Sequence, residues 1–185
     1  MKKIVPWLVL VGVLVLMSME LRFQGRLWVC SCGYVRLWTG NINSSDNSQH
    51  LFDPYTFTHV LHGFLFLGLV HLLWTRLPTV WKFVAVLSVE ALWEVFENTN
   101  FIIERYRSET ISLGYVGDTI VNSFGDIAAC AFGAALAWRL GLARTLLVTA
   151  AIEGVLLLTI RDSLLLNIIM LIHPIDAIRV WQAGH

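Results

Sequence analysis

Residues 53–78 of the chain read DPYTFTHVLHGFLFLGLVHLLWTRLP, a long apolar run bounded by two prolines. Asp53 is a favourable helix cap and Pro54 suits the first helical turn, whereas Pro78 prevents the helix from continuing. The residues between them are mainly apolar, and about 20 such residues let a helix cross the hydrocarbon core of a bilayer. The run therefore predicts a membrane-spanning helix over residues 55–77.

The sequence on both sides of this run contains further apolar stretches of similar length. Each predicts another membrane-spanning helix, over residues 4–21, 79–98, 116–140 and 142–160. Residues 22–54 are a polar loop, and residues 101–115 are a loop or an interfacial turn. Residues 163–181 are apolar over a shorter length and contain Pro174. They form either a short or kinked sixth span, which we favour, or a helix that lies in the membrane interface.

The composition agrees with a chain that lies in a membrane. Hydrophobic residues make up 57% of the chain and charged residues 14%, and the mean hydropathy is +0.69. These values argue against a disordered chain and against an ordinary soluble enzyme. The formal net charge is zero and there is no basic run, which argues against nucleic-acid binding. We therefore expect an all-α polytopic membrane helix bundle of five to six transmembrane helices, folded as a single integral membrane domain over residues 1–185.

The first apolar stretch also bears on orientation. No small-x-small cleavage site follows it, so we expect the helix to be retained rather than removed as a signal peptide. Lys2 and Lys3 precede it, and the positive-inside rule then places the N-terminus in the cytoplasm. In that orientation the loop 22–54 lies on the outer side of the membrane.

Acidic side chains are unusually frequent in the predicted spans. A charge at mid-bilayer costs about 2.5–3.5 kcal/mol on insertion scales, and no Lys or Arg lies well inside a span to offset it. The acids must therefore be protonated, reach water, bind a cation, or pair with a charge from a loop, for which Arg105 and Arg107 are the candidates. The acids are Glu90, Glu94, Glu97, Asp118, Asp126 and Glu153.

The spacing of the polar residues predicts that they converge. Glu90, Glu94 and Glu97 share one helix face, as do Asp118, Asn122 and Asp126, and His59 and His62 share another. All three faces approach the membrane surface on the side of the loop 22–54, because each helix enters or leaves there. A single pocket of imidazoles and carboxylates near the outer surface is the expected result.

A pocket of this composition suits a metal-dependent enzyme that acts on a lipid or a lipid-linked substrate. Histidine with carboxylates suits a divalent transition metal such as zinc, and a remaining carboxylate can act as a general base. The expected metal ligands are His59, His62, Glu94 and Asp118. The expected catalytic residues are Glu94, Glu97, Asp118 and Asp126, and the expected substrate-binding residues are Arg105, Arg107 and Asn122.

Other functions stay open from the sequence alone. The deep acids Glu90, Asp126 and Glu153 could form a cation or proton path of a transport or binding module. The whole polar cluster could also only fix helix packing in a structural scaffold. The sequence therefore leaves undecided whether the protein is an enzyme. Its partners are membrane lipids in every case.

The accessory candidates are Cys30, Cys32, His50, Glu90 and Glu153. Cys30 and Cys32 either pair as a disulfide or bind a metal together with His50. Glu153 either completes the cluster or pairs with Arg161. We expect His71 to be a packed core residue. We expect Cys130 to pack within the small-residue stripe Gly125, Ala129 and Gly133.

Several motifs resemble an uncharacterised family of bacterial multi-pass membrane proteins described only as of unknown function. They are CSCG (30–33), NSQH (47–50), DPYTFTHVLHG (53–63), WEVFEN (93–98), RYR (105–107), SLGYVGD (112–118), NS (122–123) and WQAG (181–184). The resemblance implies several spans in the bacterial cell (inner) membrane and carries no activity. A looser similarity over the second to fourth spans links the chain to VanZ-like membrane proteins, a glycopeptide-resistance group, and concerns the fold alone.

Overall fold

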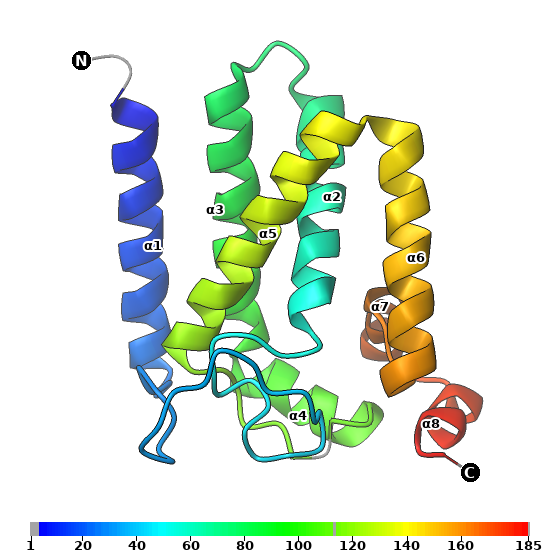
Figure 1. The fold of residues 1–185 in the computed structure, drawn as a ribbon. Helices are drawn as coiled ribbons and strands as arrows, with labels where there is room; N and C mark the ends of the chain where they lie inside the picture. Colours follow the sequence, from blue (N-terminus) through cyan, green and yellow to red (C-terminus); the bar gives the residue numbers. More distant parts are fainter. Residues whose placement is uncertain (1–3, 113, 185) are drawn as a thin grey trace.

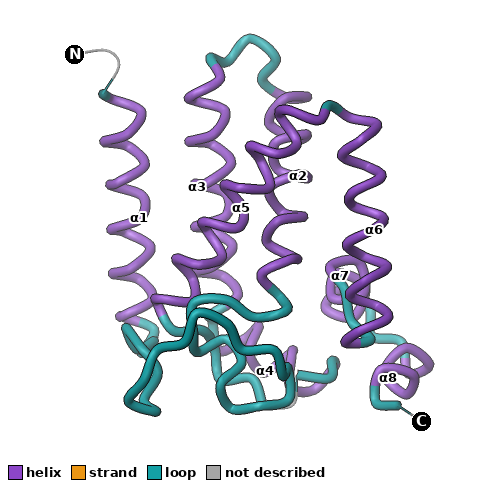
Figure 2. Tube along the Cα trace, in the orientation of Figure 1, coloured by secondary structure: helices purple, strands orange, loops and turns teal. Residues whose placement is uncertain are grey.

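The structure is a computed structural model that describes residues 4–112 and 114–184. Within these residues the chain forms eight helices and no strand (Figure 2). The helices are α1 (Val5–Phe23), α2 (Thr56–Leu73), α3 (Thr79–Glu97), α4 (Asn100–Glu109), α5 (Ile120–Leu140), α6 (Leu142–Ile160), α7 (Leu164–Ile172) and α8 (Asp176–Gln182). The long helices lie at the positions that the apolar stretches predict.

The long helices α1, α2, α3, α5 and α6 are connected alternately at the two ends of the molecule (Figure 1). The loop between α1 and α2, helix α4, and the short helices α7 and α8 gather at one end, drawn at the bottom (Figure 1). Four helices, α1, α2, α5 and α6, are long and apolar enough to cross a membrane. Helix α3 has 19 residues, as α1 has, but it contains the buried charged residues Lys82, Glu90 and Glu94. The fold is an all-α membrane helix bundle, as predicted.

The segment 163–181 differs from the favoured sixth span. It forms α7, which has 9 residues, and α8, which has 7 residues, with Pro174 between them. At about 1.5 Å per residue, neither helix can cross a hydrocarbon core that is about 30 Å thick. The segment therefore forms no continuous membrane-spanning helix, because proline interrupts it, and the choice between a kinked span and an interfacial segment stays a prediction.

Two threonine caps also move the predicted boundaries. The Thr99 hydroxyl accepts a hydrogen bond from the backbone N–H of Ile102, so residues 100–109 form a helix rather than a loop. The Thr119 hydroxyl accepts from the backbone N–H of Asn122, so α5 begins at Ile120 and not at residue 116. Lys2 and Lys3, on which the predicted orientation depends, lie outside the described residues.

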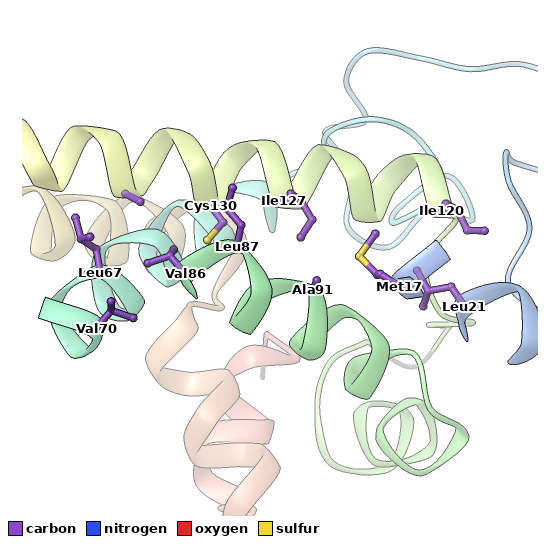
Figure 3. Packing of buried hydrophobic residues seen from close by; sticks show 11 residues of the cluster. Met17, Leu21, Leu67, Val70, Val86, Leu87, Ala91, Ile120, Ile127 and Cys130 are labelled. Carbon is purple, nitrogen blue, oxygen red and sulfur yellow. The ribbon is translucent and has the colours of Figure 1, made fainter. Parts of the chain in front are cut away.

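The hydrophobic core joins α1, α2, α3 and α5. Figure 3 shows the side chains of Met17, Leu67, Val86 and Ile127 converging from these four helices. Cys130 is fully buried in the same cluster, which confirms its predicted packing role.

Helices α2 and α5 approach each other unusually closely, and glycine makes this possible. A Cβ atom at Gly63 of α2 would collide with the carbonyl oxygen of Cys130. A Cβ atom at Gly133 of α5 would collide with the carbonyl oxygen of Val60. Gly125 lies in the same way against the carbonyl oxygen of Leu51. The predicted small-residue stripe is therefore the contact that holds the histidine-bearing helix against α5.

Candidate functional site

Two histidines of α2 and one glutamate of α3 form the centre of the site. The Nδ1 atom of His59 lies 2.6 Å from Oε1 of Glu90, and the Nδ1 atom of His62 lies 3.1 Å from Oε2 of the same carboxylate. All three residues are buried, and one ligand atom from each lies within 4.8 Å of the other two. The His59 and His62 rings pack edge to face, with centroids 5.0 Å apart. The structure thus brings the predicted pair together around Glu90, which the sequence made only an accessory residue.

Two further carboxylates lie beside His59 without adequate partners. Oε1 of Glu94 is 3.5 Å from Nδ1 of His59, and Oδ2 of Asp126 is 3.9 Å from Nε2 of the same ring. Within the described residues, both carboxylate oxygens of Glu94 and Oδ1 of Asp126 are buried without a hydrogen-bond partner. No Lys or Arg of the described chain forms an ion pair with Glu90, Glu94 or Asp126. The centre of the site is therefore short of positive charge and of hydrogen-bond donors.

Asp118 and Glu97 form an outer layer that is tied to the loop end of the bundle. Oδ2 of Asp118 accepts hydrogen bonds from Nδ2 of Asn98, at 2.7 Å, and from the Tyr115 hydroxyl, at 2.9 Å. Oε1 of Glu97 accepts from the Tyr106 hydroxyl at 2.9 Å. Asp118 precedes α5, so it does not share a helix face with Asn122 and Asp126 as the spacing predicted. Among the described residues, the possible metal-binding groups around His59 include Glu97 but not Asp118.

A cavity of about 170 Å³ opens beside these residues. One wall is polar and includes His59, His62, Asn122 and Asp126. Another part of the wall is apolar and comes from α2 and α7, through Leu65, Phe66, Leu164, Ile168 and Leu171. Nδ2 of Asn122 is buried and has no hydrogen-bond partner in the described chain. The cavity can therefore take a molecule with one polar and one apolar part.

Aromatic and loop residues complete the cavity wall, and sequence reasoning missed them. Tyr106 and Tyr115 lie in the RYR and SLGYVGD motifs, which were the only sequence indication of their role. Trp93 lines the cavity, although tryptophans near span ends suggested only interfacial anchors. Asp53 also lines it, and burial raises the pKa of Asp53, while hydrogen bonds from the backbone of Ser48 and Tyr55 act in the opposite direction.

Arg105 and Arg107 lie outside the site, contrary to expectation. Arg105 donates to the backbone carbonyl oxygens of Leu171 and Ile172, and Arg107 donates to that of Tyr115. Because residues 100–109 form a helix, Arg105 reaches the last turn of α7 and Arg107 reaches the loop before α5, rather than the buried acids. Among the described residues that line the cavity there is no Lys or Arg.

The remaining candidates also lie elsewhere. Oε1 of Glu153 accepts from the backbone N–H of Leu165, so Glu153 neither completes the cluster nor pairs with Arg161. His71 is exposed rather than packed in the core, and its Nδ1 atom lies 3.0 Å from Nζ of Lys82. Cys30 and Cys32 are joined by a disulfide in the loop between α1 and α2, with buried His50 nearby.

A buried aspartate between α6 and α7 joins the cavity wall to the C-terminal helix. Oδ2 of Asp162 accepts a hydrogen bond from the Tyr55 hydroxyl at 3.0 Å, and Oδ1 accepts from Nε2 of Gln182 at 3.0 Å. Burial raises the pKa of Asp162 to about 6, although hydrogen bonds from Ser163 and Tyr55 act in the opposite direction. No sequence pattern indicated a role for Asp162.

The raised pKa of Asp162 predicts a specific pH dependence of stability. The folded chain holds a proton on Asp162 more tightly than the unfolded chain, whose pKa is near 3.8. This contribution to stability is complete below about pH 4 and is lost as the pH rises through about 6. It amounts to about 3 kcal/mol, since a difference of one in pKa corresponds to about 1.4 kcal/mol. We expect Asp162→Asn to remove this loss, measured as the difference in thermal unfolding midpoint between variant and parent from pH 4 to 7. A constant difference across that range would contradict the assignment.

Comparisons with known proteins agree with the resemblance seen in the motifs. Residues 21–184 match the family described as a protein of unknown function (DUF2585). A UPF0314 protein of Sinorhizobium fredii is 47% identical over 179 residues, which cover 96% of this chain and 91% of the relative. A UPF0314 protein of Rhizobium meliloti is 47% identical over 94% of this chain and 88% of its own length. A third UPF0314 protein, from Paracoccus denitrificans, is 43% identical over 93% of this chain and 89% of its own length.

No solved structure matches the chain significantly. The sequence match, by contrast, extends from the end of α1 through the buried histidines and carboxylates to the last helical turn. On this match, the chain belongs to the DUF2585 family of bacterial proteins of unknown function.

Proposed function

We propose that this protein is a multi-pass protein of the bacterial inner membrane that uses a divalent transition metal to act on a lipid or lipid-linked substrate. One observation carries the proposal. Among the residues that the structure describes, three oxygens of Glu94 and Asp126 find no hydrogen-bond partner, and they are buried around the group His59, His62 and Glu90. Unpaired buried carboxylates are costly, and a divalent cation at their centre offsets that cost.

The donor set suits the proposed ion. Two imidazoles and a carboxylate are a common ligand set for catalytic zinc, and the same donors also suit iron and manganese. His59, His62 and Glu90 would hold the ion, because their ligand atoms already lie within 4.8 Å of one another. Glu94, 3.5 Å from His59, would add the second negative charge that neutralises a divalent cation.

Two side chains on the cavity wall suit the chemical step. Asp126 lines the cavity, and its Oδ1 has no partner in the described part of the chain, so it can accept a proton from a water molecule there. Asn122 lines the same wall, and its unpartnered Nδ2 can donate a hydrogen bond to a substrate oxygen that gains negative charge. The ion would contribute Lewis-acid polarisation of the bond that breaks. This combination suits a hydrolytic or transfer reaction.

The shape of the cavity supports a lipid-like substrate. The apolar wall from α2 and α7 gives an acyl or prenyl chain a surface to pack on, and the polar wall receives the head group. The cavity lies toward the end of the bundle where the loop 22–54 and helices α4, α7 and α8 gather (Figure 1). In the predicted orientation this is the outer face of the membrane. The head group would be held by the ion, by Asn122 and by the tyrosine hydroxyls.

Metal analysis of the purified protein tests the proposal. We expect roughly one transition-metal ion per chain after purification without chelators, and less than about one tenth of that in the double variant His59→Ala, His62→Ala. His71→Ala is the matched control, since His71 lies on the same helix but outside the site, and it should retain the metal. The proposal fails if the parent protein takes up no ion even after incubation with zinc, or if the double variant retains its ion.

A further inference from the structure

The loop between α1 and α2 contains a disulfide whose position contributes little to the stability of the fold. Cys30 and Cys32 are bonded with a single residue between them. A disulfide stabilises a protein mainly by restricting the unfolded chain, and the effect grows with the length of the loop that it closes. Closing so short a loop restricts little, and the bond joins no two helices. A structural role therefore explains this disulfide poorly.

The two sulfur atoms lie in different environments. Cys32 is exposed, whereas only 7% of Cys30 is exposed. The backbone N–H of Cys32 donates to Sγ of Cys30, at 3.1 Å. An attacking thiolate can reach Cys32, and its attack makes Cys30 the leaving group. A hydrogen-bond donor beside a leaving thiolate lowers its pKa and speeds the exchange.

His50 is a second candidate donor near the same sulfur atoms. It is 1% exposed, and one of its ring nitrogens lies within 4.8 Å of both Sγ atoms. Its Nδ1 atom accepts the backbone N–H of Arg36 at 3.3 Å, so the proton of the neutral ring is on Nε2. Within the described chain Nε2 is buried and has no hydrogen-bond partner, and its nearest acidic oxygen, Oδ2 of Asp46, is 3.7 Å away.

The ring of His50 is held in place by its neighbours. Tyr34 stacks on it with centroids 5.2 Å apart, and Asp46 is fixed in turn by an ion pair with Arg36 at 2.9 Å. A buried N–H that lacks an acceptor is unfavourable. A thiolate released at Cys30 would give this N–H a charged acceptor. These surroundings therefore stabilise the reduced form of this cysteine pair more than the surroundings of an ordinary surface disulfide would.

We propose that Cys30 and Cys32 form a redox-active disulfide that accepts two electrons from the dithiol of another protein on this side of the membrane. A thiolate of the partner attacks Sγ of Cys32, the bond between Cys30 and Cys32 breaks, and Cys30 leaves as a thiolate. The second partner thiolate then attacks the mixed disulfide and releases Cys32 as a thiolate. Both thiolates take up protons from solvent, and the partner ends as a disulfide. This proposal is independent of the proposed metal site.

Thiol trapping on the purified full-length protein tests the order of attack. Glutathione serves as the monothiol probe, and the reaction is quenched with iodoacetamide before peptide mass analysis. We expect the glutathione on Cys32 and the alkyl group on Cys30. Glutathione found mainly on Cys30 would overturn the proposal, and so would a disulfide that excess dithiothreitol reduces only after the protein is unfolded.

The rate of reduction by dithiothreitol tests the role of His50. We expect His50→Gln to slow reduction by about tenfold, because the leaving thiolate loses its second donor. His173→Gln, which changes an exposed histidine between α7 and α8, should leave the rate within about twofold. If both variants react at the parent rate, His50 plays no part and the proposed site is wrong. Unfolding midpoints of the variants show whether a slow rate reflects lost structure.

Discussion

Gly63→Leu leaves no folded bundle in detergent, and even Gly63→Ala lowers the free energy of unfolding by about 1–3 kcal/mol: these are the results that we expect. A Cβ atom at Gly63 would overlap Cys130 and Ala134, and the atoms that it meets belong to the backbone of α5. Backbone inside a helix cannot move aside as a flexible side chain can, so the two helices must separate. Their separation would also move the two histidines away from Asp126.

The chain offers matched controls for this effect. Gly68 lies on the same helix and Gly154 on α6, and a Cβ atom at either would meet nothing within 4 Å. Alanine there should be neutral or stabilising by up to about 1 kcal/mol, because it favours the helix over the unfolded chain. Thermal unfolding followed by circular dichroism measures all three variants. Equal midpoints for Gly63→Ala and Gly68→Ala would show that α2 and α5 are not in backbone contact.

Glu94→Gln is expected to weaken zinc binding by roughly 100-fold while it raises the thermal stability of the metal-free protein. Glu94 is fully buried, and within the described chain neither of its carboxylate oxygens has a hydrogen-bond partner. Without an ion, an ionised Glu94 would be buried with no hydrogen-bond partner in the described chain, and glutamine removes the ionisable group. With an ion, the same change removes part of the charge that neutralises a divalent cation.

Competition with a chromophoric chelator measures the affinity, and thermal unfolding after treatment with a chelator measures the metal-free stability. Glu153→Gln is the control, since Glu153 lies on α6 and its carboxylate accepts a hydrogen bond from the backbone of Leu165, away from the site. It should change neither quantity. A variant Glu94→Gln that is more stable both with and without zinc, at unchanged affinity, would indicate a protonated scaffold and would contradict the metal-dependent function.

The sequence predicted those features that depend on local pattern. Apolar length and proline positions placed the long helices, and the spacing of His59, His62, Glu90 and Glu94 predicted faces that do converge. The spacing predicted this convergence because consecutive spans cross the membrane in alternate directions. The position of a residue along its span therefore gives its depth in the membrane. The small-residue stripe on α5 likewise predicted the close packing that the structure shows at Gly133.

The features that the sequence could not predict depend on tertiary contacts. Arg105 and Arg107 looked like partners for the acids, but a cap at Thr99 turns their segment into a helix. Arg105 then donates to backbone carbonyl oxygens of α7, and Arg107 to that of Tyr115. Asp118 looked like part of α5, but the cap at Thr119 places it before the helix. Two other features join residues that are far apart along the chain, so no local sequence pattern predicts them. They are the apolar wall from α7 and the contact between Tyr55 and Asp162.

The hydrogen bond between Gln182 and Asp162 has a practical consequence for anyone who expresses this protein. Gln182 lies in the last turn of α8, and through Asp162 it reaches Tyr55 on the cavity wall. We expect an affinity tag or fluorescent fusion at the C-terminus to weaken the hydrogen bonds that join Gln182, Asp162 and Tyr55. Helix α1 begins at the other end of the bundle (Figure 1), so a purification handle placed before α1 avoids this hydrogen bond.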